Sequence, residues 1–219
     1  MIINLFHMKK KTKIPPLVLA SKSPRRKELL EQAGLTFAVV PSCFDEDSLN
    51  ISVPENLVKA LAEAKARDVA GAYPESWVIG ADTIVLIHGE ILGKPDSRET
   101  ARRMIQKLNG QAHEVYTGYA IFCETMKTCI SGVEKTEVYF RDLSQQEIEW
   151  YIQTDEPYDK AGAYAIQGLG SFLVKRICGS YTNVVGLPVC EVLEHLLKKG
   201  IVAVSNENHW RICAYPQVA

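Results

Sequence analysis

Two arginines follow a helix-start signal near the beginning of the chain. Ser23 and Pro24 are residue types favoured at the N-cap and first position of an α-helix, so Arg25 and Arg26 fall in the first turn. Positive charge is unfavourable there because of the helix dipole, whereas free backbone N–H groups suit phosphate. Arg26 also falls inside the apolar face of the helical wheel. We therefore favour a phosphate or nucleotide site over a solvated basic turn.

A lysine interrupts the apolar face of the next predicted helix, residues 54–72. Leu61 and Val69 lie on that face, and Lys65 lies in its middle. Either the lysine stem packs on the core while the ammonium reaches water, or the ammonium points into a polar cleft shared with Arg26. We favour the shared cleft. If the ammonium is unpaired there, Lys65→Met is expected to cost little stability.

Asp82 is the one carboxylate in the apolar run from Val78 to Ile87. A buried carboxylate needs a cation or a metal to stay ionised, so Asp82 is a candidate general base or metal ligand. The acidic run at 45–47 can supply a second carboxylate, although a solvated loop accounts for at least two of its three residues. Lys94 lies at the end of a hairpin strand, where surface exposure is the default.

Several common site types lack the required spacing. The histidines show no His-x-x-x-His or HExxH pattern and the six cysteines no Cys-x-x-Cys pattern, so zinc is not expected. There is no Walker A motif, and the glycine-rich stretch at 162–170 is not a Gly-x-Gly-x-x-Gly motif that opens a helix.

The composition is that of an ordinary globular protein, with 219 residues, 47% hydrophobic, 23% charged, and a formal net charge of -1. This balance gives no reason to expect a nucleic-acid polymer as partner, so a nucleotide must be met by a local cluster of charge. The residue order at the start is wrong for a secretory signal, and no run is long enough to span a membrane. Reduced core thiols and a cytoplasmic location are expected.

The pattern predicts a mixture of parallel and hairpin strands with helices between them. Strands are expected at 17–20, 36–41, 76–87, 113–124, 129–141 and near 171–177, and helices at 24–33, 54–72, 97–108, 145–153 and 189–199. This order indicates an α/β (α+β mixed) fold with a mixed sheet in a single domain. Residues 1–13 are expected to form a flexible extension, 14–200 the domain, and 201–219 a tail without clear periodicity.

Six sequence blocks occur in a fixed order along the chain. The blocks are LASKSPRR at 19–26, GADT at 80–83, GKP at 93–95, YTG at 116–118, DKAGAYAIQG at 159–168 and GSYTNVVGLP at 179–188. Together they resemble the Maf family of nucleoside triphosphate pyrophosphatases, and the similarity runs from about Leu17 to Lys199. The resemblance implies an elongated mixed-sheet domain with a central cleft, related to inosine-triphosphate pyrophosphatases.

The resemblance also implies roles for the charged residues. Asp82 matches the family's proton acceptor. The family's other charged cleft positions are matched by Arg26, Glu46, Lys65 and Lys94, and Ser23 completes the expected phosphate site. The implied metal is a divalent cation, Mg²⁺ with Mn²⁺ as the alternative, held by Asp82 and Glu46.

Three further positions separate branches of the family. Arg25, Thr83 and Gln167 resemble the branch that acts on dTTP and UTP, whereas the branch acting on 7-methyl-GTP has Trp, Gln and Glu there. The implied activity is hydrolysis of these nucleotides, and of modified pyrimidine nucleotides, to the monophosphate and pyrophosphate. The alternatives are a non-catalytic nucleotide-binding regulator of septum formation and a purine-triphosphate pyrophosphatase. Whether the chain forms a homodimer is left open.

Overall fold

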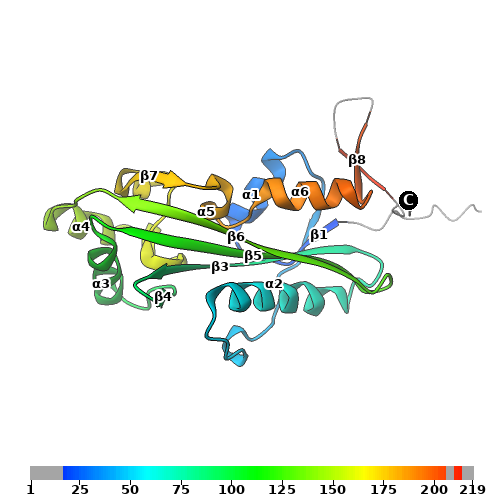
Figure 1. Ribbon diagram of the computed structural model, residues 1–219, viewed down its shortest axis with the longest axis horizontal. Coiled ribbons are helices and arrows are strands. Elements are labelled where there is room, and N and C mark those ends of the chain that lie inside the picture. Colours follow the sequence, from blue (N-terminus) through cyan, green and yellow to red (C-terminus); the bar gives the residue numbers. More distant parts are fainter. Residues whose placement is uncertain (1–16, 206–209, 214–219) are drawn as a thin grey trace, which may run out of the picture.

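The computed structural model describes residues 17–205 and 210–213, so the extension predicted at 1–13 lies outside the described residues. The fold is elongated and mixes helices with one large sheet, as predicted (Figure 1). The helices are α1 (Pro24–Gln32), α2 (Pro54–Ala70), α3 (Arg98–Leu108), α4 (Gln145–Ile152), α5 (Tyr181–Val185) and α6 (Val189–Lys198). The strands are β1 (Leu17–Leu19), β2 (Ala38–Val39), β3 (Trp77–Ile87), β4 (Glu90–Leu92), β5 (Ala112–Cys123), β6 (Thr128–Phe140), β7 (Val174–Cys178), β8 (Val202–Val204) and β9 (Trp210–Ile212).

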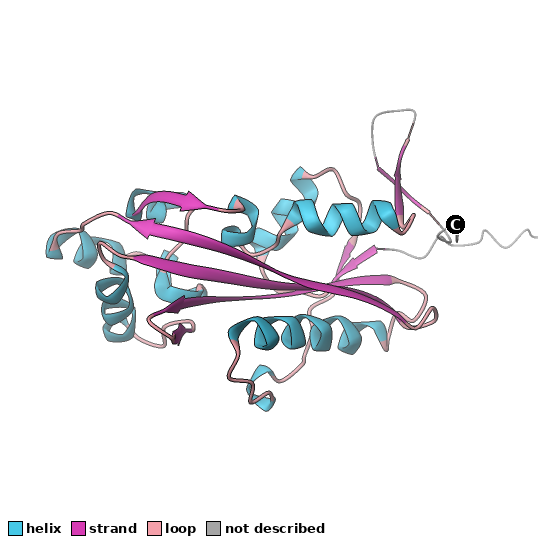
Figure 2. Ribbon diagram, viewed as in Figure 1, coloured by secondary structure: helices cyan, strands magenta, loops and turns pink. Residues whose placement is uncertain are grey.

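The sheet is built on three long antiparallel strands, β3, β5 and β6, which run along the length of the molecule (Figure 2). The strand order is β2-β1-β3-β5-β6-β7, and β1 is parallel to both of its neighbours. Both β1 and β4 pair with the same edge of β3. Strand β1 covers that edge up to Ile79, and β4 covers it from Val85. Between these two points β3 pairs only with β5, which leaves a gap in the sheet.

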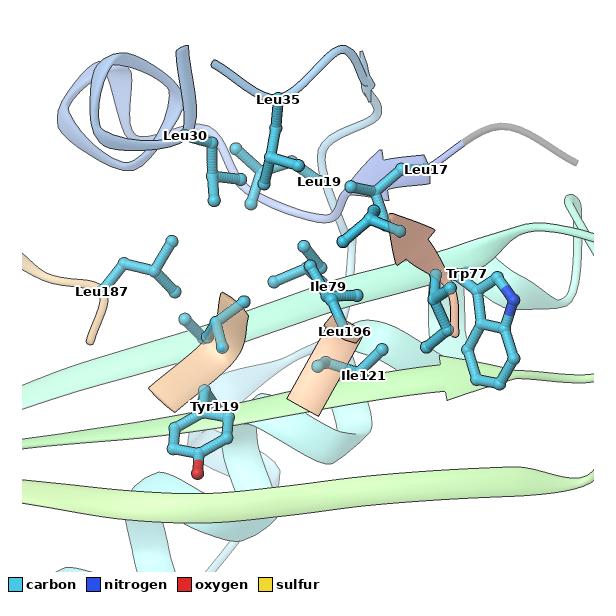
Figure 3. Packing of buried hydrophobic residues seen from close by; sticks show 14 of the residues in the cluster. Leu17, Leu19, Leu30, Leu35, Trp77, Ile79, Tyr119, Ile121, Leu187 and Leu196 are labelled. Carbon is cyan, nitrogen blue, oxygen red and sulfur yellow. The ribbon is translucent and has the colours of Figure 1, made fainter. Parts of the chain in front are cut away.

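Alternation along the strands sends neighbouring residues to opposite faces. In β1, Leu17 and Leu19 belong to the core beneath α1 and α6, whereas Val18 belongs to the core beneath α2 (Figure 3). The same alternation along β3 places Asp82 on the α2 face and Thr83 on the α1 face. Asp82 and Thr83 are therefore adjacent in sequence but face two different helices.

Two glycines let α2 lie directly on the sheet at this point. A Cβ at Gly80 would come within 2.2 Å of the carbonyl oxygen of Ala62, and one at Gly118 within 2.2 Å of that of Val58. Gly118 on β5 is the register partner of Asp82. Because the helix backbone rests on these bare positions, the side chains of α2 can reach the level of Asp82.

The structure differs from the sequence prediction in several places. Of the strand expected at 36–41, only Ala38–Val39 pairs in the sheet. Residues 168–173 form a 3-10 helix, so the strand expected from 171 begins only at Val174. Residues 179–188, for which the pattern predicts no helix or strand, contain α5, whose N-cap Ser180 accepts a hydrogen bond from the Asn183 N–H. Residues in the expected tail form the antiparallel strand pair β8–β9. This segment is held against the domain because Ile201 and Val202 pack into the core shared with α1 and α6. Strands of three residues, such as β8 and β9, are too short to show an alternating hydrophobic pattern in the sequence.

All six cysteines are free, but the prediction that they lie in the core is wrong for Cys43, Cys178 and Cys190, which are exposed. Within the part of the chain that the structure describes, none of the helices combines the length and the apolar character needed to cross a membrane.

We predict that Gly118→Ala destabilises the protein by about 1–3 kcal/mol, because the new methyl group pushes α2 away from the sheet. The matched control is Gly71→Ala at the end of α2. A Cβ there would have no neighbour nearer than 3.6 Å, and we expect a change within about 0.5 kcal/mol. Urea unfolding of both variants measures the difference. Equal stability of the two variants would contradict the close-packing argument.

Candidate active site

A cavity of about 830 Å³ occupies the gap at the edge of β3. Its walls come from the turn between β1 and α1, the segment after β4, and the loops at 159–167 and 184–186. The structure brings together here every site residue predicted from the sequence: Ser23, Arg25, Arg26, Glu46, Lys65, Asp82, Thr83, Lys94 and Gln167.

Lys65 is the centre of the charge network on the α2 side. Its Nζ lies 2.6 Å from Asp82 Oδ1 and 2.8 Å from Glu46 Oε1. Lys65 and Asp82 are only 8% and 7% exposed, so water screens this pair little. The sequence-based premise of an unpaired ammonium is therefore wrong, although the predicted position of the lysine in a polar cleft is confirmed.

Glu46 reaches this network from a short 3-10 helix, Glu46–Ser48, which Asp45 caps by accepting a hydrogen bond from the Asp47 N–H. Burial alone would raise the pKa of Glu46. The hydrogen bond and charge of Lys65 outweigh it, with help from the charges of Lys94 and Arg26, so the pKa of Glu46 lies below its usual value. Glu46 therefore stays ionised at neutral pH.

Arg26 extends from α1 to the α1 face of β3, which is the face opposite to that of Lys65 and Asp82. Its Nε donates to the Gly186 carbonyl at 2.7 Å, and its Nη2 donates to Thr83 Oγ1 at 3.1 Å. Burial lowers the pKa of Arg26 while the charge of Asp82 opposes that effect, and the guanidinium stays protonated in any case. The helical-wheel anomaly is explained, since the side chain turns inward to the cavity.

Ser23 and Lys94 line the cavity from two separate segments of the chain. Ser23 is the N-cap of α1 as predicted, but its side chain makes no capping hydrogen bond. Lys94 follows β4 and is exposed, as its sequence position suggests, yet its charge acts on Glu46.

The three branch-separating residues approach from separate segments. Arg25 Nη1 donates to Asp159 Oδ2 at 2.9 Å. The hydroxyl of Thr83 lies 2.9 Å from that of Thr117, in addition to its bond from Arg26. Gln167 precedes the 168–173 3-10 helix and lines the cavity, half-buried.

The cavity carries more positive than negative side chains. Six basic side chains line it, from Lys22, Arg25, Arg26, Lys65, Lys94 and Lys160, against four acidic ones, from Glu46, Asp47, Asp82 and Asp159. An overall net charge of -1 thus conceals a local basic surplus. The arrangement suits a polyanion with several phosphate groups, since cations lie on both sides of β3.

Sequence reasoning gave no role to Asp159 or Lys160, which line the cavity and form an ion pair of 2.5 Å. The available signal was a charged pair directly before the glycine-rich segment. Thr117 was missed as well, since a hydroxyl in a strand carries no signal until its register partner Thr83 is known.

The two carboxylates expected to hold a metal are those of Asp82 and Glu46. Within residues 17–205 and 210–213, no group of three or more His, Cys, Asp and Glu side chains is arranged to hold a metal ion. Asp82 and Glu46 do converge, because both contact the same Lys65 ammonium.

The chain is similar to known proteins along most of its length. The family model described as Maf-like protein matches residues 16–199. The dTTP/UTP pyrophosphatase of Geotalea uraniireducens (strain Rf4) is 50% identical over 186 residues, covering 85% of this chain and 96% of that protein. The enzyme of the same name from Halalkalibacterium halodurans is 49% identical over 84% of this chain and 96% of its own length. That from Syntrophus aciditrophicus (strain SB) is 45% identical over 89% of this chain and 95% of its own length.

The geometry reverses the stability effect expected for Lys65→Met. Removing the ammonium leaves the buried Asp82 carboxylate without its cation, so we predict a loss of roughly 3 kcal/mol. The double variant Lys65→Met, Asp82→Asn removes that uncompensated charge and recovers most of the loss. Denaturant unfolding of the single and double variants gives the coupling energy. If the stability losses of the two single variants add up to that of the double variant, the interaction between Lys65 and Asp82 contributes nothing to the free energy of unfolding.

Proposed function

The chain belongs to the Maf family, and from this membership and the charged cleft we propose that it hydrolyses dTTP and UTP to the monophosphate and pyrophosphate. The observation that carries the proposal is a buried carboxylate, Asp82, within a cavity that has a surplus of basic side chains. The dTTP/UTP pyrophosphatase relatives match this chain over more than four fifths of its length.

We assign triphosphate binding to the basic residues on the two sides of β3. Arg26 and the start of α1 lie on one side, and Lys65 and Lys94 line the same cavity. Their charges offset the negative charge of the triphosphate and stabilise the charge that develops on the departing pyrophosphate. Ser23 and the backbone N–H groups that begin α1 offer further hydrogen bonds to phosphate.

We assign the proton-accepting role to Asp82. A base must take a proton from the water that attacks the α-phosphorus, and Asp82 faces the cavity with Oδ1 bonded to Lys65. Lys65 keeps the carboxylate in place through this contact. Among the described residues, no partner holds Asp82 Oδ2, so this oxygen is the one directed to water.

The donor set fits a divalent cation. The carboxylates of Asp82 and Glu46 converge, and phosphate oxygens of the substrate would complete an all-oxygen set of the kind that Mg²⁺ or Mn²⁺ accepts. When bound, such an ion supplies Lewis-acid polarisation of the phosphoryl group and neutralises charge. Lys65 bridges the two carboxylates.

We assign base selection chiefly to Gln167. The Thr83 hydroxyl is already engaged by Arg26 and Thr117, so it supports the cleft rather than facing the base freely. Gln167 offers both an acceptor and a donor, which match the alternating carbonyl and N–H edge of thymine or uracil. Arg25 lines the same cavity.

We also propose a cytoplasmic location, because six free cysteines suit a reducing compartment. Homodimer formation stays a prediction.

The substrate assignment is tested by measuring pyrophosphate release, with Mg²⁺, from dTTP, UTP, CTP, ATP, GTP and 7-methyl-GTP. We expect the highest kcat/KM for dTTP and UTP, and loss of that preference in Gln167→Glu, which cannot donate to the base carbonyl. Gln106→Glu, an exposed residue of α3, is the matched control. Nucleotide binding without pyrophosphate release would favour a non-catalytic regulator, and a preference for GTP or 7-methyl-GTP would exclude the pyrimidine branch.

The catalytic assignment is tested with Asp82→Asn. The amide oxygen can still accept from Lys65, so we expect a folded protein that binds dTTP while kcat falls at least about a hundredfold. Asp142→Asn, an exposed position away from the cavity, should keep full activity. Near-normal turnover in Asp82→Asn would make Asp82 a structural residue.

A further inference from the structure

Gln167 lines the cavity from the loop directly before the 168–173 3-10 helix. Among the residues that the structure describes, no hydrogen bond holds its side chain, although the residue lines the cavity and is half-buried. A residue that distinguishes bases by hydrogen bonds must be held within a fraction of an ångström of its working position. The anchor must therefore lie in the surrounding loop.

The carboxylate of Glu156 holds the loop on one side of Gln167. Its Oε2 accepts from the Leu169 N–H at 2.9 Å, and its Oε1 accepts from the Gly170 N–H at 2.6 Å. Two backbone N–H groups in a row thus point at one carboxylate, and charge-assisted hydrogen bonds of this kind are the stronger ones. The turn directly after Gln167 is fixed by these bonds.

Tyr151 of α4 holds the loop on the other side. Its hydroxyl donates to Glu156 Oε1 at 2.9 Å and accepts from the Ala165 N–H at 3.2 Å. The side chain is fully buried. Burial, and then the charge of Glu156, raise the pKa of Tyr151 above its usual value, so the hydroxyl stays protonated as a donor. Gln167 therefore lies between two anchored points.

Glycines shape the loop around this carboxylate. Gly168 has a φ of +66°, and a Cβ there would lie 2.4 Å from Glu156 Oε2. A Cβ at Gly170 would lie 2.4 Å from the Ala165 carbonyl oxygen. Only glycine allows the backbone to approach the carboxylate this closely, which accounts for two glycines of the glycine-rich stretch.

The same segment reaches Arg25. Lys160 Nζ donates to the Glu156 carbonyl and to Asp159 Oδ1, both at 2.5 Å, and Asp159 Oδ2 accepts from Arg25 at 2.9 Å. Burial would raise the pKa of Asp159, but Lys160 and Arg25 lower it below its usual value, so the carboxylate stays charged. Two of the three branch-separating residues are thus tied to residues 156–160.

We propose that Glu156 is a positioning residue for base selection, which fixes the 165–170 backbone so that Gln167 faces the base and links this loop to Arg25 through Lys160 and Asp159. This inference rests on the proposed function only in taking the base to be read at Gln167.

The test is Glu156→Gln. The amide nitrogen cannot accept a hydrogen bond, so at least one loop N–H loses its partner and the loop shifts. We expect the ratio of kcat/KM for dTTP to kcat/KM for GTP to fall at least about tenfold. A merely structural role would lower the melting temperature and leave this ratio unchanged. If Glu156→Gln does not fold, Tyr151→Phe is tested in the same way. This variant keeps the core volume and removes only the hydroxyl that joins Glu156 to the Ala165 N–H.

The matched control is Glu147→Gln. Glu147 also accepts hydrogen bonds at a helix start, from Ser144, and pairs with Arg141, but it does not contact the 165–170 loop. Its variant should lose stability and keep the wild-type base preference. An unchanged preference in Glu156→Gln or Tyr151→Phe overturns the inference. If the wild-type protein prefers a purine nucleotide, the proposed substrate is wrong. The role of Glu156 is then decided by whether Glu156→Gln loses that purine preference, which supports the inference, or keeps it, which overturns the inference.

Discussion

The cleft depends on an interruption in the sheet. Strand β1 covers the edge of β3 as far as Ile79 and β4 covers it from Val85, so the segment between them pairs on one side only. Side chains that leave this segment toward opposite faces can therefore meet one cavity. A continuous sheet would have separated Asp82 from Thr83 by a layer of backbone. Here the alternation of the strand supplies the α2 face and the α1 face of the same site.

The buried pair of Lys65 and Asp82 fixes α2 over this gap. A charge pair with so little exposure stabilises a structure only when its geometry is close to ideal, because both ions give up water. That geometry requires the helix backbone to lie on Gly80 and Gly118, where any side chain would collide with helix carbonyl groups. The glycines thus set the height of α2 above the sheet, and that height places Lys65 in contact with both Asp82 and Glu46.

Much of this arrangement could be predicted from the sequence, because misplaced charges are visible there. Arg26 and Lys65 lie on apolar helix faces and Asp82 lies in an apolar strand, and the structure places all three in the cavity. The Lys65–Asp82 contact could not be predicted, since it depends on how closely α2 approaches the sheet. Glu156 had no signal either, because a glutamate next to a proline in a loop looks solvated until its backbone partners are known.

The two ends of the cleft are held by different means, and the difference bears on selectivity. At the end of the cleft that we assign to the triphosphate, charged side chains would meet groups that every nucleoside triphosphate carries, so they would add affinity without distinguishing bases. Discrimination must come from the other end, where a polar side chain left unpaired by the wrong base raises the barrier. Such a penalty exists only if the side chain cannot move to a new partner. A loop fastened through backbone N–H groups to a carboxylate, with glycines at the points of contact, provides that rigidity.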